Sequence, residues 1–393
     1  MSETLRLGVI GLGRAAAQTL PSIVAHPHVR VVAAADPSAE ARSRFVADFG
    51  APAFAGIEEL CAHAAVDALY VATPHQRHVT DVLIAAANGK HVLVEKPMAL
   101  TIEDCRAMTS AAARAGVALV AGPTHGMDPA VVRIAQIASS GELGRVRMIT
   151  NIVYGDFLYR PRRPEELDTA LGGGIMYNQV PHQIEIAREI DGGPVRTIRA
   201  TTGVWDARRT TEGASAAFVE FESGTVAQLT YNGYDRFDSD ELCGWIGEMG
   251  AEKPRDRHGA ARRALKVVAG PDAEAHLKAA SGFAQAGVMR APGAVHQPHF
   301  GFLLVSCERG DLRPSADGVL IYGDDGVREI PLEQARAFPN RLNAIDELYD
   351  AVARGVAPRH DGAWGTETLA TVLAMMTSAR ERREVAVGTM VDS

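Results

Sequence analysis

The sequence predicts an α/β protein of two domains: an N-terminal doubly wound parallel sheet, followed by an α+β domain with a large, mostly antiparallel open sheet. In the first 125 residues, short apolar runs alternate with longer amphipathic stretches, as in a parallel sheet covered by helices. Beyond Asp128 the strand-like runs alternate in polarity and are joined by Gly-containing turns, as antiparallel hairpins are. At 393 residues the chain is long enough for both domains.

The first domain, which we place at residues 1–125, contains five apolar runs expected to be its strands. They are LRLGVIG, VRVVAAAD, VDALYVAT, HVLVEK and VALVAG. Each is followed by a helix candidate, such as RAAAQTLPSIVA after the first run. QRHVTDVLIAAANG follows the third and ends at Gly89, a glycine suited to a helix C-cap.

The second domain, residues 126–393, is predicted from strand pairs such as AAFVEFESGTVAQLTYN and GVLIYGDDGVREIPL. An insert at about 235–300 is charged and rich in loops, and KPRDRHGAARRALK within it resembles a basic helix on a solvated face more than a nucleic-acid arm. The segment TETLATVLAMMTSARERR has apolar residues at helical spacing and a basic end, which predicts a final helix.

The composition favours small-molecule chemistry. The net charge is -8, and the basic residues are scattered, so we expect neither nucleic acid nor an anionic membrane as partner. The four cysteines are far apart, which indicates neither a disulfide framework nor a cysteine zinc site. No signal-peptide pattern and no apolar stretch of ~18 residues occurs, so we expect a cytoplasmic protein.

The first strand runs into GLGRAA, residues 11–16, a G-x-G-x-x-A turn that opens a helix. Its glycines permit a tight turn and the close approach of a pyrophosphate to the helix N-terminus, as in a Rossmann domain. The second strand ends in Asp36, whose carboxylate would accept hydrogen bonds from the ribose hydroxyls and repel a 2′-phosphate. We therefore predict NAD in preference to NADP. The alternative is that Asp36 merely caps the next helix.

Two further segments end strands at the carboxyl edge of the sheet, where open α/β sheets bind ligands. They are ATPHQRH, residues 72–78, and Glu95-Lys96-Pro97. A lysine in a partly dry cleft exchanges protons readily, although a lysine at such a place is more often a surface charge. The residues expected to bind the cofactor are Gly11, Leu12, Gly13, Arg14, Ala15, Asp36, Thr73, Pro74, His75, His78, Glu95 and Lys96.

GGGIMYNQVPH, residues 172–182, combines three glycines with an amide and a histidine. Because proline is tolerated only near the first turn of a helix, Pro181 places Asn178 at or beside the N-cap and His182 in the first turn. A helix N-terminus disfavours imidazolium, so we expect His182 to be neutral and able to accept a proton. The glycines would lie near the nicotinamide. The alternative is that Asn178 is only a cap and His182 only packs.

This ordered set of motifs resembles the Gfo/Idh/MocA family of glucose-fructose oxidoreductase and inositol dehydrogenase relatives over nearly the whole chain. The resemblance implies that Lys96 and His182 lie by the nicotinamide and handle the proton as hydride leaves carbon. The family's motif has an aspartate where this chain has Asn178, which argues against schemes that need a carboxylate there; an amide still positions a hydroxyl through hydrogen bonds. The family also implies a homo-oligomer, either a dimer or a tetramer.

Two features bear on the substrate. YRPRRPEELD supplies Arg160, Arg162 and Arg163, and guanidinium groups are suited to binding carboxylates. HQPHFGFLLVSCERGDLRPS is similar to the phthalate 4,5-cis-dihydrodiol dehydrogenase branch of the family. That similarity implies oxidation of a ring carbinol by NAD to a ketone, which enolises to the catechol 4,5-dihydroxyphthalate.

We also expect His125 and Tyr177 to contact the substrate. His296 and His299 flank Gln297-Pro298, and the proline argues against one helix presenting both to a metal, so no metal is expected. Two rival functions remain at this point: a sugar or inositol dehydrogenase, and a catalytically silent NAD-binding regulatory protein.

Overall fold

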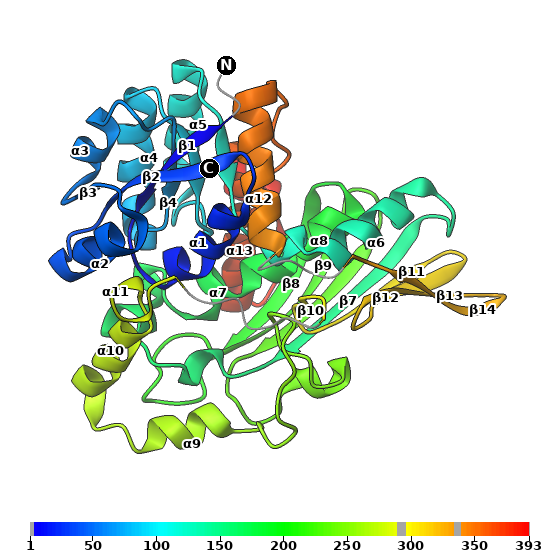
Figure 1. Ribbon diagram of the computed structural model, residues 1–393. Helices are drawn as coiled ribbons and strands as arrows, with labels where there is room; N and C mark the ends of the chain where they lie inside the picture. The colour runs from blue at the N-terminus through cyan, green and yellow to red at the C-terminus, as the bar shows by residue number, and fades with distance from the viewer. Residues whose placement is uncertain (1–3, 289–295, 334–338, 393) are drawn as a thin grey trace. The chain divides into compact units, whose positions relative to one another are not determined.

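The computed structural model describes residues 4–288, 296–333 and 339–392, and the chain divides into two compact units (Figure 1). The first unit comprises residues 1–123, 276–291 and 341–369. The second unit comprises residues 124–275, 292–340 and 370–393. Each unit has its own sheet.

The first unit contains a parallel sheet of six strands in the order β3-β2-β1-β4-β5-β6. Its strands are β1 (Leu5–Ile10), β2 (Val29–Ala35), β3 (Ala53–Phe54), β4 (Ala68–Val71), β5 (His91–Val94) and β6 (Leu119–Ala121). The strand order reverses between β1 and β4. The loops that follow these two strands therefore run to opposite sides, and the crevice between them is where such sheets bind nucleotides. The predicted doubly wound sheet is confirmed, with the two-residue β3 as an additional strand.

Helices cover this sheet (Figure 1). Those of the N-terminal segment are α1 (Arg14–Ala25), α2 (Ala39–Phe49), α3 (Ile57–Ala62), α4 (His78–Ala87) and α5 (Ile102–Ala115). The short helix α11 (Phe283–Ala286) comes from the predicted insert and packs on α2, where the Phe283 ring lies 6.3 Å from Phe45 and 6.4 Å from Phe49, between ring centroids. The insert therefore contributes an aromatic contact to the core of the first unit.

Further helices lie beyond residue 269. They are α10 (Gly270–Ala280), α12 (Pro339–Tyr349), a π-helical turn η7 (Asp350–Arg354) and α13 (Gly362–Glu381). The predicted C-terminal helix thus corresponds to α13, which begins four residues before the predicted TETLATVLAMMTSARERR segment. None of the described helices combines the length and the apolar character needed to span a membrane.

The second unit contains a sheet of nine strands in the order β14-β13-β12-β11-β7-β10-β9-β8-β15. Every neighbouring pair is antiparallel except β7 and β10, which are parallel. The strands are β7 (Val146–Tyr154), β8 (Val195–Gly203), β9 (Ala214–Phe221), β10 (Val226–Asn232), β11 (Phe302–Cys307), β12 (Gly310–Pro314), β13 (Gly318–Gly323), β14 (Gly326–Pro331) and β15 (Val385–Ala386). The predicted large, mostly antiparallel open sheet is confirmed.

Helices α6 (Pro129–Ser140) and α8 (Val180–Asp191) cover one face of this sheet (Figure 1). Alternate residues of β7 are buried, as expected for a strand with one covered face. The side-chain nitrogen of Gln183 on α8 donates to the side-chain oxygen of Asn151 on β7 at 2.7 Å, which ties the helix to the strand through two buried amides. This packing positions the N-terminal turn of α8, which carries His182.

The remaining helices of the second unit are short. They are α7 (Gly174–Asn178), α9 (Ala260–Lys266) and α14 (Gly388–Asp392). The basic segment of the insert forms α9, and none of its residues is fully buried, which agrees with a solvated face.

Candidate active site

The nucleotide-binding turn follows β1. Gly11 has a φ of +88°, and a Cβ atom there would lie 2.7 Å from the carbonyl oxygen of Ala72, so only glycine fits. Gly13 is the N-cap of α1 and no side chain caps this helix; a Cβ on Gly13 would have nothing within 4 Å. The turn therefore leaves open space above uncapped N–H groups, which is what a pyrophosphate requires.

Asp36 is joined to this turn. One carboxylate oxygen accepts the N–H of Leu12 at 2.7 Å and the other accepts the N–H of Ser38 at 2.8 Å. The N-cap of α2 is Ser38, whose hydroxyl accepts the N–H of Ala41. The alternative that Asp36 serves only as the cap is wrong, because Ser38 does so. The residues of the turn and Asp36 together fit the phosphates and ribose of NAD.

The ATPHQRH segment lies at the end of β4, as predicted. The Thr73 hydroxyl donates to Asp81 at 2.7 Å. His78 is fully buried, and its ring nitrogens lie 3.0 Å from the carbonyl oxygen of Pro97 and 2.9 Å from that of Thr73. Burial lowers the pKa of His78. His78 is thus a buried tether between two loops, with both ring nitrogens engaged by the protein; His75 is half-buried.

Glu95 and Lys96 follow β5. Glu95 is 9% exposed and accepts a hydrogen bond from the hydroxyl of Tyr70, and its burial raises the pKa of the carboxyl group. Lys96 is half-buried. The two neighbours therefore differ in environment: Glu95 is held in the core of the first unit, whereas Lys96 is partly exposed at the end of β5.

In the second unit, the glycines of GGGIMYNQVPH form a turn that packs closely on the protein itself. A Cβ on Gly173 would lie 2.6 Å from the carbonyl oxygen of Glu166, and one on Gly174, whose φ is +75°, would overlap the hydroxyl of Thr211. These contacts require glycine without any ligand. Within this unit, then, packing against residues 166–168 and Thr211 accounts for the two glycines that we expected to serve the nicotinamide.

Asn178 closes the same turn. Its amide nitrogen donates to the carbonyl oxygens of Gly172 at 3.1 Å and Gly174 at 2.8 Å. A carboxylate has no hydrogen to donate, so the amide is explained by local structure. Asn178 ends α7, and Gln179 is the N-cap of α8, so the prediction that Asn178 lies beside the N-cap is correct. The neighbouring Tyr177 is 7% exposed.

His182 lies in the first turn of α8, directly after Pro181, as predicted. It is 8% exposed, and its Nδ1 accepts the main-chain N–H of His125 at 3.3 Å. The ring centroids of His182 and His125 are 4.8 Å apart, and Phe300 packs on both rings. The structure therefore brings together two of the predicted site residues that lie 57 positions apart in the sequence.

His125 belongs to a charged group that we call the His125 cluster: His125, Asp128, Asp156, Arg160 and Glu248. The ring nitrogens of His125 lie 2.7 Å from an oxygen of Asp128 and 3.1 Å from one of Glu248. Arg160 pairs with Asp156 at 2.7 Å and with Glu248 at 3.4 Å. The cluster thus holds three carboxylates and two cations.

Burial opposes a charge on His125, but the carboxylates of Asp128 and Glu248 outweigh it and raise the pKa of His125 to about 9. His125 is therefore an imidazolium at neutral pH. Burial likewise opposes ionisation of Glu248, yet the hydrogen bond from His125 and the charge of Arg160 hold the pKa of Glu248 well below its usual value. His125 and Glu248 thus hold each other in their charged forms.

The three predicted arginines differ in environment. Arg162 is 7% exposed; it donates to the carbonyl oxygen of Phe157 at 2.7 Å, and its guanidinium lies 3.7 Å from the centroid of that ring. Arg163 is exposed and pairs with Glu165 and Glu166 of the same loop. Only Arg160 lies in the His125 cluster.

Sequence reasoning missed Asp128, Asp156, Glu248 and Phe300. The spacing of three between His125 and Asp128 was a usable signal, since the pair forms within one turn. No sequence signal links His125 with Glu248, because the insert brings them together from 123 residues apart.

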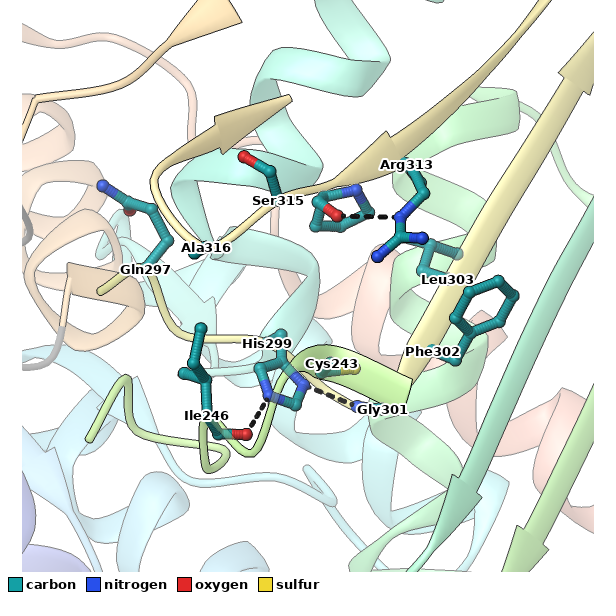
Figure 2. A pocket seen from close by; sticks show the side chains of 11 residues that line it. Cys243, Ile246, Gln297, His299, Gly301, Phe302, Leu303, Arg313, Ser315 and Ala316 are labelled. Atoms are coloured by element: carbon teal, nitrogen blue, oxygen red, sulfur yellow. Dashed lines mark hydrogen bonds between the residues drawn. The ribbon is translucent and has the colours of Figure 1, made fainter. Parts of the chain in front are cut away.

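A separate pocket in the second unit is lined by residues of the insert and of β11 and β12 (Figure 2). His299, in its wall, lies 2.8 Å from the carbonyl oxygen of Ile246 through Nε2 and accepts the N–H of Gly301 at Nδ1. Both ring nitrogens are therefore engaged by the protein. Nowhere in the described ranges do three or more His, Cys, Asp or Glu side chains form a group that could hold a metal.

Comparison with known proteins agrees with these motifs. Residues 5–122 match the model of the oxidoreductase family with an NAD-binding Rossmann fold, and residues 131–251 match that of the GFO/IDH/MocA C-terminal domain. A solved chain from Bordetella bronchiseptica RB50 superposes with a TM-score of 0.92 at 43% identity, covering 98% of this chain and 100% of that one.

Among curated relatives, the 1-carboxy-3-chloro-3,4-dihydroxycyclohexa-1,5-diene dehydrogenase of Comamonas testosteroni is 40% identical over 96% of this chain and 95% of its own length. Inositol 2-dehydrogenase 2 of Saccharopolyspora erythraea is 31% identical over 64% of this chain and 74% of its own length. The chain therefore belongs to the Gfo/Idh/MocA family and is an NAD(P)-dependent oxidoreductase.

Proposed function

We propose that this protein is an NAD-dependent dehydrogenase that oxidises a carboxylate-bearing cyclohexadiene cis-diol to the corresponding catechol. Phthalate 4,5-dihydrodiol, oxidised to 4,5-dihydroxyphthalate, is the member of this class predicted from the sequence. The observation that carries the proposal is coverage: similarity to the dihydrodiol dehydrogenase extends over 96% of this chain, whereas similarity to the inositol dehydrogenase covers 64%.

The residues of the first unit support NAD in particular. Asp36 is held by the N–H groups of Leu12 and Ser38, so its charge stays beside the nucleotide turn. A fixed carboxylate accepts hydrogen bonds from both ribose hydroxyls and repels a 2′-phosphate. His78 acts here by holding the Thr73 and Pro97 loops, and we assign it no contact with the cofactor.

When bound, NAD supplies the acceptor for the hydride of the ring carbinol. The protein itself has to accept the hydroxyl proton and hold the oxygen in place. We assign these two tasks to Lys96 and His182, as the family resemblance implies. The ketone produced enolises to the catechol as the ring C–H proton is lost and the carbonyl oxygen takes up a proton, and the gain of aromaticity draws the reaction forward. General-base help of this kind is worth ~10² to 10⁴ in rate.

The His125 cluster supports a substrate that carries both hydroxyl and carboxylate groups. Its carboxylates can accept hydrogen bonds from substrate hydroxyls, and Arg160 is a cation whose guanidinium is suited to a carboxylate. The longest contact in the cluster is that of Arg160 with Glu248, at 3.4 Å. We infer that a substrate carboxylate takes the place of Glu248 on Arg160, which frees a Glu248 oxygen to accept a substrate hydroxyl.

The test is a spectrophotometric assay of NAD and NADP reduction with phthalate 4,5-cis-dihydrodiol, a monocarboxylated cis-dihydrodiol, an unsubstituted cis-dihydrodiol, inositol and common sugars. We expect turnover with NAD and a carboxylated diol. Preference for inositol or a sugar would replace the proposal by the polyol alternative. NAD binding without reduction by any compound would establish the silent regulatory alternative.

A matched pair of variants tests the proposed contact between Arg160 and a substrate carboxylate. Arg160→Gln should raise KM about 10-fold or more for a carboxylated diol, the loss of one charge-assisted hydrogen bond, and leave KM for the unsubstituted diol nearly unchanged. Arg163→Gln removes the same charge from the exposed loop and should change neither KM. Equal effects of the two substitutions would exclude Arg160 as the carboxylate ligand.

The dimer or tetramer implied by the family resemblance remains a prediction, to be checked by light scattering. The uncovered sheet face exposes Phe218 (52%) and Met148 (45%), apolar side chains of the kind that subunit contacts bury.

A further inference from the structure

A short hairpin of the insert carries Glu248 to the His125 cluster. It spans residues 245–253 and is closed by the N–H of Lys253, which donates to the carbonyl oxygen of Trp245 at 2.7 Å; Glu248 lies in the turn between the two arms. An isolated two-stranded hairpin is marginally stable at best in water. The position of the Glu248 carboxylate therefore depends on what the hairpin packs against.

His299 makes two of the contacts that hold this hairpin. Its Nε2 lies 2.8 Å from the carbonyl oxygen of Ile246, and because a carbonyl oxygen can only accept, Nε2 donates (Figure 2). Its main-chain N–H donates to the carbonyl oxygen of Glu248 at 3.3 Å. The ring is itself fixed, since Nδ1 accepts the N–H of Gly301 at 3.1 Å. His299 thus connects the hairpin to the segment that leads into β11.

A third contact holds the far side of the turn. The main-chain N–H of His296 donates to the carbonyl oxygen of Gly250 at 3.2 Å. Gly250 has a φ of +79°, and a Cβ atom on it would overlap the carbonyl oxygen of His296, so only glycine permits this approach. The ring of His296 turns elsewhere, with Nδ1 2.9 Å from a carboxylate oxygen of Asp317. His296 therefore holds the hairpin through its main chain alone.

The same segment continues into the site. Phe300 follows His299, and its ring centroid lies 4.8 Å from that of His125 and 5.0 Å from that of His182. Glu248 lies 3.1 Å from His125, but 35% of its side chain is exposed, so water competes for the carboxylate. A flexible side chain within reach of water stays on one partner only when its main chain is held in place.

We propose that His299 is a positioning residue for Glu248. By holding the carbonyl group of Ile246, its ring keeps the Glu248 carboxylate in the His125 cluster, where that carboxylate competes with a carboxylated substrate for Arg160. The effect on substrate selectivity rests on the proposed dehydrogenase function, whereas the positioning does not. The two histidines of HQPHF thus have separate tasks and need no shared metal.

An NMR titration of the His125 ring in the full-length protein tests the positioning without any substrate. Glu248→Gln sets the scale, since loss of this carboxylate should lower the pKa of His125 by ~1 pH unit or more. In His299→Asn the side-chain oxygen can still accept the N–H of Gly301, but no donor reaches Ile246. In His299→Gln the amide nitrogen replaces the Nε2 donor. We expect the pKa of His125 to fall in His299→Asn by at least half as much as in Glu248→Gln, and to stay at its wild-type value in His299→Gln.

The two substitutions at His299 are matched in charge. Both remove a titratable ring that Asp240 and Cys243 flank, so an effect of that charge alone would be equal in the two variants. An equal fall of the His125 pKa in His299→Asn and His299→Gln, or no fall in His299→Asn, would overturn the proposal.

Two further variants perturb the same contact from the hairpin and supply a control. In Gly250→Ala the new Cβ overlaps the carbonyl oxygen of His296 and displaces the hairpin, so the pKa of His125 should fall. This variant decides the matter if His299→Asn does not fold, and an unchanged pKa here contradicts the proposal. His296→Asn keeps the main-chain N–H that bonds to Gly250 and should leave the pKa of His125 unchanged. A fall in His296→Asn as large as that in His299→Asn would indicate a site shared by both rings and would refute the role of His299.

The consequence for selectivity is measured as a ratio of kcat/KM values. When Glu248 is no longer held, a carboxylated cis-dihydrodiol meets less competition for Arg160, whereas an unsubstituted one only loses a hydroxyl acceptor. His299→Asn should therefore raise kcat/KM for the carboxylated diol relative to the unsubstituted diol ~10-fold, the effect of one charge-assisted hydrogen bond, and His299→Gln should not. An unchanged ratio in His299→Asn would exclude the role in selectivity. If the wild type oxidises no dihydrodiol, the proposed function fails, and the titration of His125 still decides the positioning.

Discussion

The charge on His125 makes a pH-dependent contribution to stability that can be worked out from its partners. Asp128 and Glu248 raise the pKa of this buried ring from 6.5 to about 9. A raised folded-state pKa stabilises the protein fully below the unfolded value of 6.5, and this stabilisation is lost as the pH rises through about 9. At ~1.4 kcal/mol per pH unit, the difference corresponds to roughly 3 kcal/mol.

Asp128→Asn isolates this contribution. Asp128 has no exposed surface, so removing its charge leaves the His125 imidazolium with Glu248 as its remaining counter-charge. We expect the variant to lose about 3 kcal/mol of unfolding free energy at pH 6, in line with other broken buried pairs, and the deficit to shrink above pH 9. Urea unfolding of both proteins across this range measures the deficit.

An NMR titration of the His125 ring checks the cause directly. The ring should titrate near 9 in the wild type and lower in Asp128→Asn. The control is Asp346→Asn, which breaks the pair of Asp346 with His26; that carboxylate is 52% exposed, and screening limits its contribution to ~1 kcal/mol or less. Titration of His125 near 6.5 in the wild type, or equal pH dependence in the two variants, would refute the reasoning.

The remaining predictions concern the two motifs that flank the chemistry. Gly13→Ala should leave the melting temperature near that of the wild type, because the added Cβ meets no protein atom, but it should raise the Kd for NAD about 10-fold or more. Gly11→Ala should lower the melting temperature, because the φ of Gly11 is +88° and a main-chain carbonyl oxygen would lie 2.7 Å from the new Cβ atom. Unchanged NAD affinity in Gly13→Ala would show that the pyrophosphate lies elsewhere. Asp36→Ser should shift the ratio of Kd values for NAD and NADP toward NADP in calorimetric titrations, and an unchanged ratio contradicts the role of this carboxylate. Asn178→Asp should cost about 1–3 kcal/mol in urea unfolding, because the amide donates to two glycine carbonyls that a carboxylate would repel; a variant as stable as the wild type would show that these hydrogen bonds contribute little.

Much of the fold follows from local patterns. The helix predicted after the first strand is α1 over Arg14–Ala25, and the strand runs of the first domain pair in the predicted parallel sheet. Pro181 alone was sufficient to place His182 in the first turn of α8. These predictions succeed because periodicity, glycine turns and the missing N–H of proline act over a few residues.

The roles of individual polar residues followed less well from the sequence. The sequence does not distinguish the arginines of YRPRRPEELD from one another, yet Arg162 is buried against Phe157 and Arg160 belongs to the His125 cluster. His78 lies in a motif predicted to contact the cofactor but is fully buried between two carbonyl groups. Burial and partners depend on packing between distant segments, which a motif does not encode.

The sequence by itself determined the family, the two kinds of sheet and the positions of Gly11, Asp36, Lys96 and His182 on their elements, since each depends on short-range chemistry. Only the tertiary structure decided the hydrogen-bond partner of His182 and the charged partners of His125. The peptide N–H that bonds to Nδ1 of His182 lies 57 residues from it, and the carboxylate of Glu248 that helps to raise the pKa of His125 lies 123 residues from that ring. Proton positions depend on the electric field and on the donors of the folded chain, and those are assembled by the fold.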